Sequence, residues 1–173
     1  MSEEDLAEPE VEPAEVLELL YEVPVTESTG QTVLHPSKDE YLDLAQTLYG
    51  DGYRMCIDLC AVDYLTNMER QVVEGVRGER FELVVNLLDL DSRRRIRLRL
   101  QVPQDSLDVP TLTDIHPGTE AMEREAFDMF GLNFLDHPDL TRILLPEEWE
   151  GHPLRKDYSI GRIPVQFKAP QGR

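Results

Sequence analysis

Residues 120–158, EAMEREAFDMFGLNFLDHPDLTRILLPEEWEGHPLRKDY, form the stretch on which the fold of this chain depends. Its first part repeats apolar residues at i, i+4, i+7 and i+8, the spacing of one helix face, at Met122, Ala126, Met129 and Phe130. Gly131 then stands in the usual position of a left-handed C-terminal cap, so we expect the helix to end there. Arg124 and Asp128 lie four residues apart, and we expect them to form an ion pair.

The character of the chain changes after Gly131. Residues 132–158 are rich in Leu, Ile, Phe and Trp but have no period, and Pro138, Pro146 and Pro153 interrupt them. Proline is excluded from helix interiors and central strands, so this segment has little scope for regular structure of its own. It is too apolar for a disordered linker. We therefore expect an extended arm that buries its side chains on its own domain or on a neighbouring polypeptide.

Three segments of this stretch carry a family resemblance: EREAFDMFG (123–131), HPDLTRIL (137–144) and WEGHPLRKDY (149–158). Together they resemble the signature of the C subunit of respiratory complex I, the NADH–quinone oxidoreductase, also known as its 30 kDa subunit family. Two positions depart from that pattern. Asp136 stands where the family usually has Gly, and Thr141 stands where it usually has a first Arg.

The resemblance implies a structural component of the peripheral arm of a proton-translocating NADH–quinone oxidoreductase, with no catalytic residue of its own. FMN, the iron–sulfur clusters and quinone would then be held by partner subunits. The partners implied are the D subunit above all, which holds the quinone site, and the B and I subunits, on the cytoplasmic side of the plasma membrane. The residues that we expect at subunit interfaces are Glu123, Arg124, Glu125, Asp128, Phe130, Gly131, His137, Pro138, Arg142, His152, Arg155, Asp157 and Tyr158.

Two other functions remain open from the residues. The chain could be the equivalent component of a related membrane oxidoreductase that takes electrons from ferredoxin, the cofactor F420 or hydrogen. It could instead be a stand-alone hydrolase that uses the acidic cluster Glu123, Glu125 and Asp128, because paired carboxylates can serve as acid and base. A helix turns residues i and i+2 apart, so a salt-bridged interface helix is the favoured interpretation of that cluster.

Composition narrows the classes of partner. The 173 residues contain 17 Lys and Arg against 35 Asp and Glu, a formal net charge of -18. Such a chain is repelled by nucleic acid and by anionic lipid headgroups. No apolar run is long enough to span a membrane, and the acidic start resembles neither a secretory signal nor a transit peptide. We therefore expect a soluble intracellular protein that reaches the membrane only through partners.

The rest of the chain predicts a small sheet with helices. Alternating apolar residues predict strands at 53–62, 81–88 and 95–102, of which the last two form a hairpin. Weaker patterns predict a helix at 14–21 and short strands at 31–34 and 111–115. A second helix should begin after Ser37, which forms a capping box with Glu40, and should stop at Gly50 and Gly52.

These elements predict an α+β fold, a two-layer domain whose small sheet is covered by helices on one face, with an extended C-terminal arm. We divide the chain into an acidic disordered tail (1–13), the α+β domain (14–131) and the arm for subunit docking (132–173). In the strand at 53–62 we expect the alternate apolar residues to point inward: Met55, Ile57, Leu59 and Ala61.

No metal or nucleotide motif stands out. Cys56 and Cys60 lie too far apart along a strand, roughly 13 Å, to form a disulfide. All four histidines precede proline, which keeps them out of helix interiors and favours turn or interface roles over metal binding. The basic stripe at Arg93, Arg94, Arg95, Arg97 and Arg99 is expected to pair with carboxylates on the adjacent strand or on a partner.

Overall fold

The computed structural model describes residues 18–159 of the chain. The predicted tail at 1–13 and the ends of the predicted helix at 14–17 and of the arm at 160–173 lie outside the described residues. In order, the elements are β1 (Leu19–Leu20), β2 (Val23–Ser28), β3 (Gln31–Leu34), α1 (Lys38–Gly50), β4 (Met55–Asp63), β5 (Phe81–Asp89), β6 (Arg94–Val102), β7 (Asp108–Pro110), the 3-10 turn η1 (Pro117–Thr119), α2 (Glu120–Phe130) and β8 (Asn133–Leu135).

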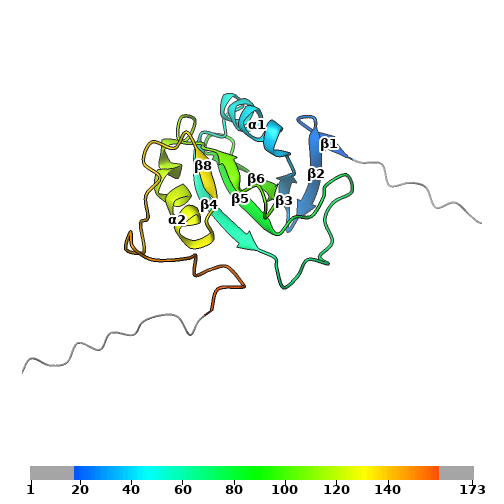
Figure 1. Ribbon diagram of the computed structural model, residues 1–173. Coiled ribbons are helices and arrows are strands. Elements are labelled where there is room, and N and C mark those ends of the chain that lie inside the picture. The colour runs from blue at the N-terminus through cyan, green and yellow to red at the C-terminus, as the bar shows by residue number, and fades with distance from the viewer. Residues whose placement is uncertain (1–17, 160–173) are drawn as a thin grey trace, which may run out of the picture.

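The described residues form a mixed α/β structure with a mainly sheet core and two α-helices. Six strands lie in the order β1-β2-β3-β6-β5-β4, and β7 and β8 form a separate parallel pair (Figure 1). The predicted hairpin is confirmed: β5 and β6 are antiparallel over their whole length, from Phe81 opposite Val102 to Asp89 opposite Arg94. β3 adds to β6 in parallel, so the chain crosses from one side of the hairpin to the other through α1 and β4.

The core forms where the apolar sides of these elements meet. The inward residues of β6, predicted from strict alternation, are all buried, and their partners on β5 are buried beside them. Helix α1 adds Tyr41, Leu44, Ala45 and Leu48 to the same cluster, and α2 adds Ala126. At the start of α1 the Glu40 carboxylate accepts hydrogen bonds from the N–H and the hydroxyl of Ser37, as the sequence predicts.

Strand β4 departs from its predicted alternation. Leu59 and Ala61 are buried as expected, but Met55 and Ile57 are exposed. The register shifts between Cys56 and Asp58, so one extra residue enters the strand as a bulge. A bulge changes which face a side chain occupies, which makes the inward prediction for Met55 and Ile57 wrong.

Two weaker predictions are also wrong where the structure describes the chain. The end of the expected helix at 14–21 is strand β1, which turns back onto β2 through Tyr21 and Glu22. Both turn residues have positive φ, the conformation of a tight hairpin turn rather than of a helix. The short strand expected at 111–115 lies instead at 108–110, where Val109 is opposite Phe134 of β8.

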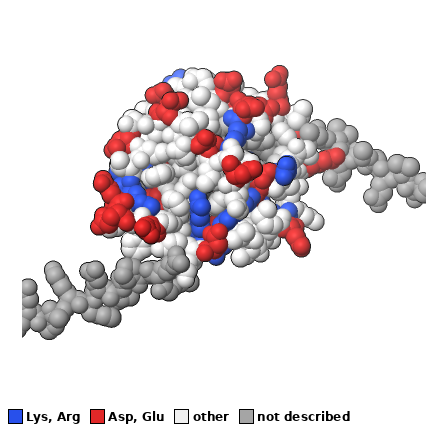
Figure 2. Space-filling view, viewed as in Figure 1, with Lys and Arg blue, Asp and Glu red and all other residues white. Residues whose placement is uncertain are grey.

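Arginines of β6 pair with carboxylates of β5 on both faces of the hairpin. On the face opposite the core, Arg99 donates to both oxygens of Glu82 at 2.8 and 3.0 Å, and at the turn end of the core-facing row Arg94 donates to Asp89 at 2.8 Å. The expectation that the basic stripe pairs with carboxylates of the adjacent strand is confirmed for these two residues. Figure 2 shows basic side chains lying among more numerous acidic ones on one face of the molecule.

Within residues 18–159 no helix is long and apolar enough to cross a membrane.

Candidate functional site where the arm meets helix α2

The arm is fastened to the domain by a buried carboxylate in the last turn of α2. Asp128 is fully buried, and its Oδ1 accepts a hydrogen bond from Nη1 of Arg142 at 2.5 Å. Its Oδ2 accepts the backbone N–H groups of Ile143, Leu144 and Leu145 at 3.1, 2.8 and 2.9 Å. Burial acts to raise the pKa of Asp128, but these donors outweigh it and hold the pKa below its usual value. One side chain of the domain therefore fixes four consecutive residues of the arm.

The expected ion pair between Arg124 and Asp128 is wrong. Arg124 points to the arm instead and donates to the carbonyl oxygens of Thr141 and Arg142 at 3.0 and 3.1 Å and to the Thr141 hydroxyl at 2.8 Å. Helical spacing made the pair plausible, but Asp128 faces inward, and its charge is met by Arg142 of the arm. The contact that competes with the i, i+4 pair comes from outside the helix.

The arm also caps the carboxyl end of α2, whose last carbonyl groups have no partner inside the helix. Three of these oxygens receive donors from the short segment 152–155. The Asp128 oxygen lies 3.0 Å from Nδ1 of His152, the Met129 oxygen 3.1 Å from the Leu154 N–H, and the Phe130 oxygen 2.6 Å from Nε of Arg155. The positive charge of Arg155 also suits the negative end of the helix dipole.

Gly131 is required at this junction for two reasons. Its φ of 75° is left-handed, which confirms the predicted C-terminal cap. A Cβ atom at this position would also lie 2.5 Å from Nη2 of Arg155 and 2.5 Å from Nε2 of His152. The sequence predicts the first reason but not the second.

A second buried carboxylate holds the far end of the arm. Asp63, at the end of β4, forms a two-bond ion pair with Arg80 at 3.0 and 2.9 Å, and its Oδ2 accepts the Lys156 N–H at 2.8 Å. Arg80 also donates to Asp157 at 2.8 Å. Although burial acts to raise it, the pKa of Asp63 is lowered by these hydrogen bonds. Neither Asp63 nor Arg80 is predicted from the sequence, because nothing near either residue marks a partner so far along the chain.

Glu123 occupies the first turn of α2 in a different environment. It is fully buried and accepts hydrogen bonds from the Thr111 hydroxyl, the Leu112 N–H and the Thr119 hydroxyl at 2.5, 2.8 and 3.0 Å. Burial raises the pKa of Glu123 in spite of these donors. The carboxylate therefore joins the helix start to the loop before it, and it lies inside its own domain.

The other residues predicted at interfaces are spread over the arm and its surroundings. The His137 ring lies 3.1 Å from the Glu120 carbonyl through Nε2, and the Tyr158 ring packs against Gly151. Glu125 and Pro138 are exposed. The structure thus brings six of the predicted residues together at the carboxyl end of α2: Asp128, Phe130, Gly131, Arg142, His152 and Arg155. Their contact with other subunits remains a prediction.

Apolar side chains of the arm divide into two groups. Leu132 and Phe134 are buried in the core of the chain itself. Ile143 and Leu144 are exposed by 41% and 60%, and Leu154 by 50%. The exposed group projects from backbone that the Asp128 and α2 contacts hold in place.

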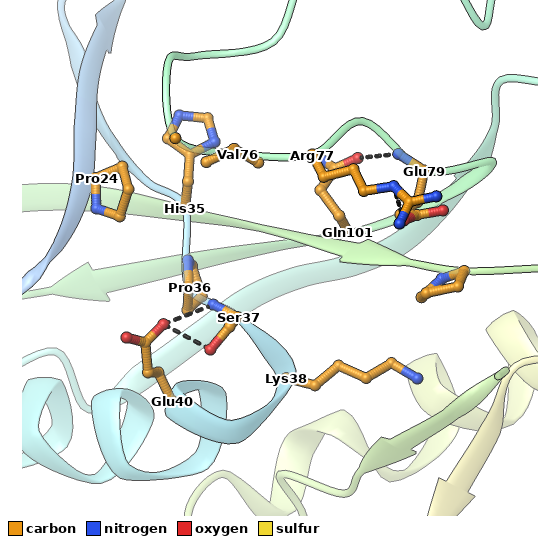
Figure 3. A pocket seen from close by; sticks show the side chains of 12 residues that line it. Pro24, His35, Pro36, Ser37, Lys38, Glu40, Val76, Arg77, Glu79 and Gln101 are labelled. Carbon is orange, nitrogen blue, oxygen red and sulfur yellow. Dashed lines mark hydrogen bonds and ion pairs between the residues drawn. The ribbon is translucent and has the colours of Figure 1, made fainter. Parts of the chain in front are cut away.

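The buried members of the acidic cluster are bound by separate sets of donors. Glu123 and Asp128 each accept hydrogen bonds from groups of their own chain, and neither lines the hollow of about 370 Å³ at the start of α1 (Figure 3). In that hollow the charged groups also hold partners, since Glu40 is bound by Ser37 and Arg77 lies 3.2 Å from Glu79. The geometry therefore offers no support for the hydrolase alternative.

The histidines and cysteines of residues 18–159 hold separate contacts. His35 contacts the Thr26 hydroxyl at 2.9 Å, and Cys56 and Cys60 are free cysteines. Among residues 18–159 no three or more His, Cys, Asp or Glu side chains are placed to hold a metal ion.

Comparison with known proteins agrees with the signature segments. The family described as respiratory-chain NADH dehydrogenase, 30 Kd subunit, matches residues 34–163. The C subunit of the NADH-quinone oxidoreductase of Roseiflexus castenholzii is 42% identical over 86% of this chain and 81% of its own length. That of Saccharopolyspora erythraea is 36% identical over 85% of this chain but only 57% of its own, longer sequence.

Two solved structures share the fold. A trypsin-resistant fragment of Nqo5 aligns with a TM-score of 0.61 at 27% identity, over 68% of this chain and 89% of the fragment. A chain of the membrane-bound sulfane sulfur reductase, an archaeal respiratory membrane complex, aligns with a TM-score of 0.66 at 20% identity over 87% of this chain and 89% of its own length. At that identity the second likeness shows the fold alone. By its sequence match over residues 34–163, this chain belongs to the family of the respiratory-chain NADH dehydrogenase 30 kDa subunit.

Proposed function

We propose that this chain is a structural and assembly component in the peripheral arm of a proton-translocating NADH–quinone oxidoreductase. The observation that carries the proposal is the fixed, exposed apolar segment at Ile143 and Leu144. Their N–H groups are bound to the buried Asp128 carboxylate, so their side chains leave the surface from an ordered backbone. Apolar groups that are ordered before binding lose little entropy when they enter a partner's pocket, which is the property of a docking site.

In this proposal the other subunits carry out electron transfer. They would oxidise NADH at FMN, transfer electrons through iron–sulfur clusters and reduce quinone, and this chain would fix their relative positions. Its own carboxylates and arginines are engaged in fastening the arm, as the Asp128–Arg142 and Asp63–Arg80 pairs show. The proposed partners are the D subunit first, then the B and I subunits, and through them the cytoplasmic side of the membrane.

An Arg142→Ala variant tests the assembly role. Arg142 donates to Asp128 and to the carbonyl oxygens of Trp149 and Gly151, so its loss should loosen the arm on both sides of the exposed apolar segment. We expect less assembled complex in native membranes and unchanged quinone reductase turnover for each assembled complex. Arg77→Ala is the matched control, because the Arg77 side chain is 89% exposed and pairs only with nearby Glu79 in the described residues.

Two results would contradict the proposal. Normal assembly of the Arg142→Ala variant with reduced turnover would indicate a catalytic role for the residue. A tagged wild-type chain that is purified from native membranes without the quinone-site subunit would show that the chain is not part of this complex.

A further inference from the structure

The part of the arm at 143–151 is a loop that Arg142 closes at its base. Nη2 of Arg142 donates to the carbonyl oxygens of Trp149 and Gly151 at 2.8 and 3.1 Å, so the two ends of the loop lie side by side. The Trp149 N–H donates to the Pro146 carbonyl at 3.0 Å and forms a turn inside the loop. The loop is therefore fixed at its turn and at its base, as well as at its first residues.

The exposed side chains of this loop are either apolar or acidic. Ile143 and Leu144 are exposed near its start, and three exposed carboxylates follow them: Glu147, Glu148 and Glu150. The sequence of the loop, ILLPEEWEG, contains no Lys, Arg or His. Among the ion pairs of residues 18–159, none involves any of these three carboxylates. The loop thus presents ordered apolar groups beside negative charges that the described part of the chain does not neutralise.

The carboxylates of the loop select the kind of surface that can receive it. Acidity alone does not indicate a site, because a chain with 35 Asp and Glu has many solvated carboxylates. Here, however, the carboxylates lie in the same closed loop as the exposed apolar side chains. If the loop entered a pocket with an uncharged border, each carboxylate at that border would lose water without gaining a partner. Lys or Arg at the border would replace the lost hydration with an ion pair, and Asp or Glu would repel the loop.

We propose that the loop at 143–151 binds an apolar pocket of a neighbouring subunit whose border carries Lys or Arg side chains. Ile143 and Leu144 enter the pocket, and Glu147 and Glu148 pair with the basic border. The inference rests on the proposed function for the existence of a partner, and it adds the chemistry of the partner's surface. The two are separable, because the chain can belong to the complex through other surfaces of the arm.

Chemical labelling of carboxylates tests whether the loop is covered in the complex. Carbodiimide-activated coupling of glycine ethyl ester, read by mass spectrometry, measures how accessible each acidic side chain is. In the isolated full-length chain Glu147 and Glu148 should react as fast as Glu69 and Glu74, which are exposed in the loop between β4 and β5. In the purified complex we expect the reaction of Glu147 and Glu148 to slow at least about tenfold, because a docked partner excludes solvent from the contact.

Each other outcome of the labelling has a definite meaning. Fast labelling of Glu147 and Glu148 in the assembled complex would overturn the inference and leave the proposed function intact. Slow labelling in the isolated chain at every concentration would show that the chain covers the loop itself, and slow labelling only at high concentration would show that a second copy covers it. Either result would overturn the inference. Absence of the wild-type chain from the purified complex would count against the proposed function instead.

A charge-reversal variant tests the basic border of the pocket. Glu147→Lys combined with Glu148→Lys should lower the amount of assembled complex in native membranes at least about fivefold, because like charges would meet at the border. The isolated variant should keep the wild-type Tm, since both side chains are exposed. Glu69→Lys combined with Glu74→Lys makes the same change of net charge in another exposed loop and should leave assembly unchanged.

An isosteric variant separates the charge of the loop from its shape. The wild-type chain should be released from the purified complex more readily as the salt concentration rises, because salt screens ion pairs at the border. Glu147→Gln combined with Glu148→Gln should lose at least about half of this salt dependence. Assembly of the Lys variant at the wild-type level, or equal salt dependence of the wild type and the Gln variant, would overturn the basic character of the border.

Discussion

The β5–β6 hairpin and the arm at 132–158 are both ordered, but by different kinds of bond. The hairpin is held by a continuous ladder from Phe81 and Val102 to Asp89 and Arg94, with alternate side chains in the core. The arm has one three-residue strand, β8, and beyond it most of its hydrogen bonds with the domain join a side chain to a backbone group. Two buried carboxylates, Asp128 and Asp63, are the centres of those contacts.

This difference predicts how each region fails. The stability of the hairpin is distributed over many similar contacts. Loss of one contact therefore slightly lowers the free energy of unfolding of the whole domain. The arm concentrates its energy in a few charged groups that have no replacement when one is removed. Damage to the hairpin should therefore lower global stability, whereas damage to a carboxylate should release the arm while the domain stays folded.

The largest effect is expected from Asp128→Ala. The change leaves the Arg142 guanidinium and the N–H groups of residues 143–145 without their acceptor, and loss of one member of a buried ion pair costs about 3–5 kcal/mol. We expect trypsin to cleave after Arg142 at least about tenfold faster, while the folded fragment that ends at Arg142 resists further digestion. Timed digestion followed by mass spectrometry measures both.

Two matched variants sharpen that result. Glu125→Ala removes an exposed carboxylate from the same helix and should change stability by less than about 0.5 kcal/mol. Leu98→Ala, in the fully buried centre of β6, should cost about 2–5 kcal/mol and lower the Tm of the whole domain. If Asp128→Ala instead unfolded the domain and the arm together, the two regions would be one cooperative unit and the comparison would fail.

An intermediate effect is expected from Gly131→Ala. The left-handed φ disfavours alanine, and its Cβ would push aside Arg155 and His152, which bind the end of α2. The two effects together should lower the free energy that holds the arm on the domain by about 1–3 kcal/mol. The measurement is the denaturant midpoint of arm release, which should fall. Gly50→Ala is the control, because a Cβ there meets no atom within 4 Å and alanine favours the helix. Equal effects of the two substitutions would show that the junction does not hold the arm.

The sequence predicts the two regions unequally for the same physical reason. Periodicity reports local geometry, so the hairpin, α1 and the end of α2 at Gly131 are predicted within a residue or two. It carries no information on contacts between distant residues, such as the Lys156 N–H with Asp63, 93 positions away. The Arg124–Asp128 error has this origin, because helical spacing is visible in the sequence and the competing Arg142 is not marked as a partner.

The sequence is also misleading at Glu123, which lies on helix α2 together with Asp128. Its charged neighbours in the sequence suggest a position on the surface. Both carboxylates are fully buried, yet their pKa values move in opposite directions. Asp128 has an arginine, whereas Glu123 is bound by neutral hydroxyl and N–H donors. The structure thus contains two buried acids whose effects on stability should depend oppositely on pH.

The smallest predicted effect is this pH dependence. Because the pKa of Glu123 is raised above its ordinary value of 4.5, the folded state holds the proton more tightly than the unfolded state. The Glu123 contribution is therefore complete below that pH and is lost as the pH rises through the raised value. The pKa of Asp128 is lowered from 3.8, so its contribution is present above that pH and is lost as the pH falls through the lowered value.

Melting curves of two isosteric variants separate these contributions. Between about pH 4 and pH 7 the Tm of Glu123→Gln should rise relative to the wild type, because the variant has no carboxyl group to ionise in the core. Asp128→Asn should show its deficit in arm protection at about pH 7 and a smaller deficit as the pH falls below 3.8, where the wild type itself loses the contribution of the carboxylate. Parallel pH profiles for the two variants would mean that the buried acids at the two ends of α2 have the same electrostatic environment. That result would contradict the distinction between Glu123, which is bound by neutral donors, and Asp128, which is ion-paired with Arg142.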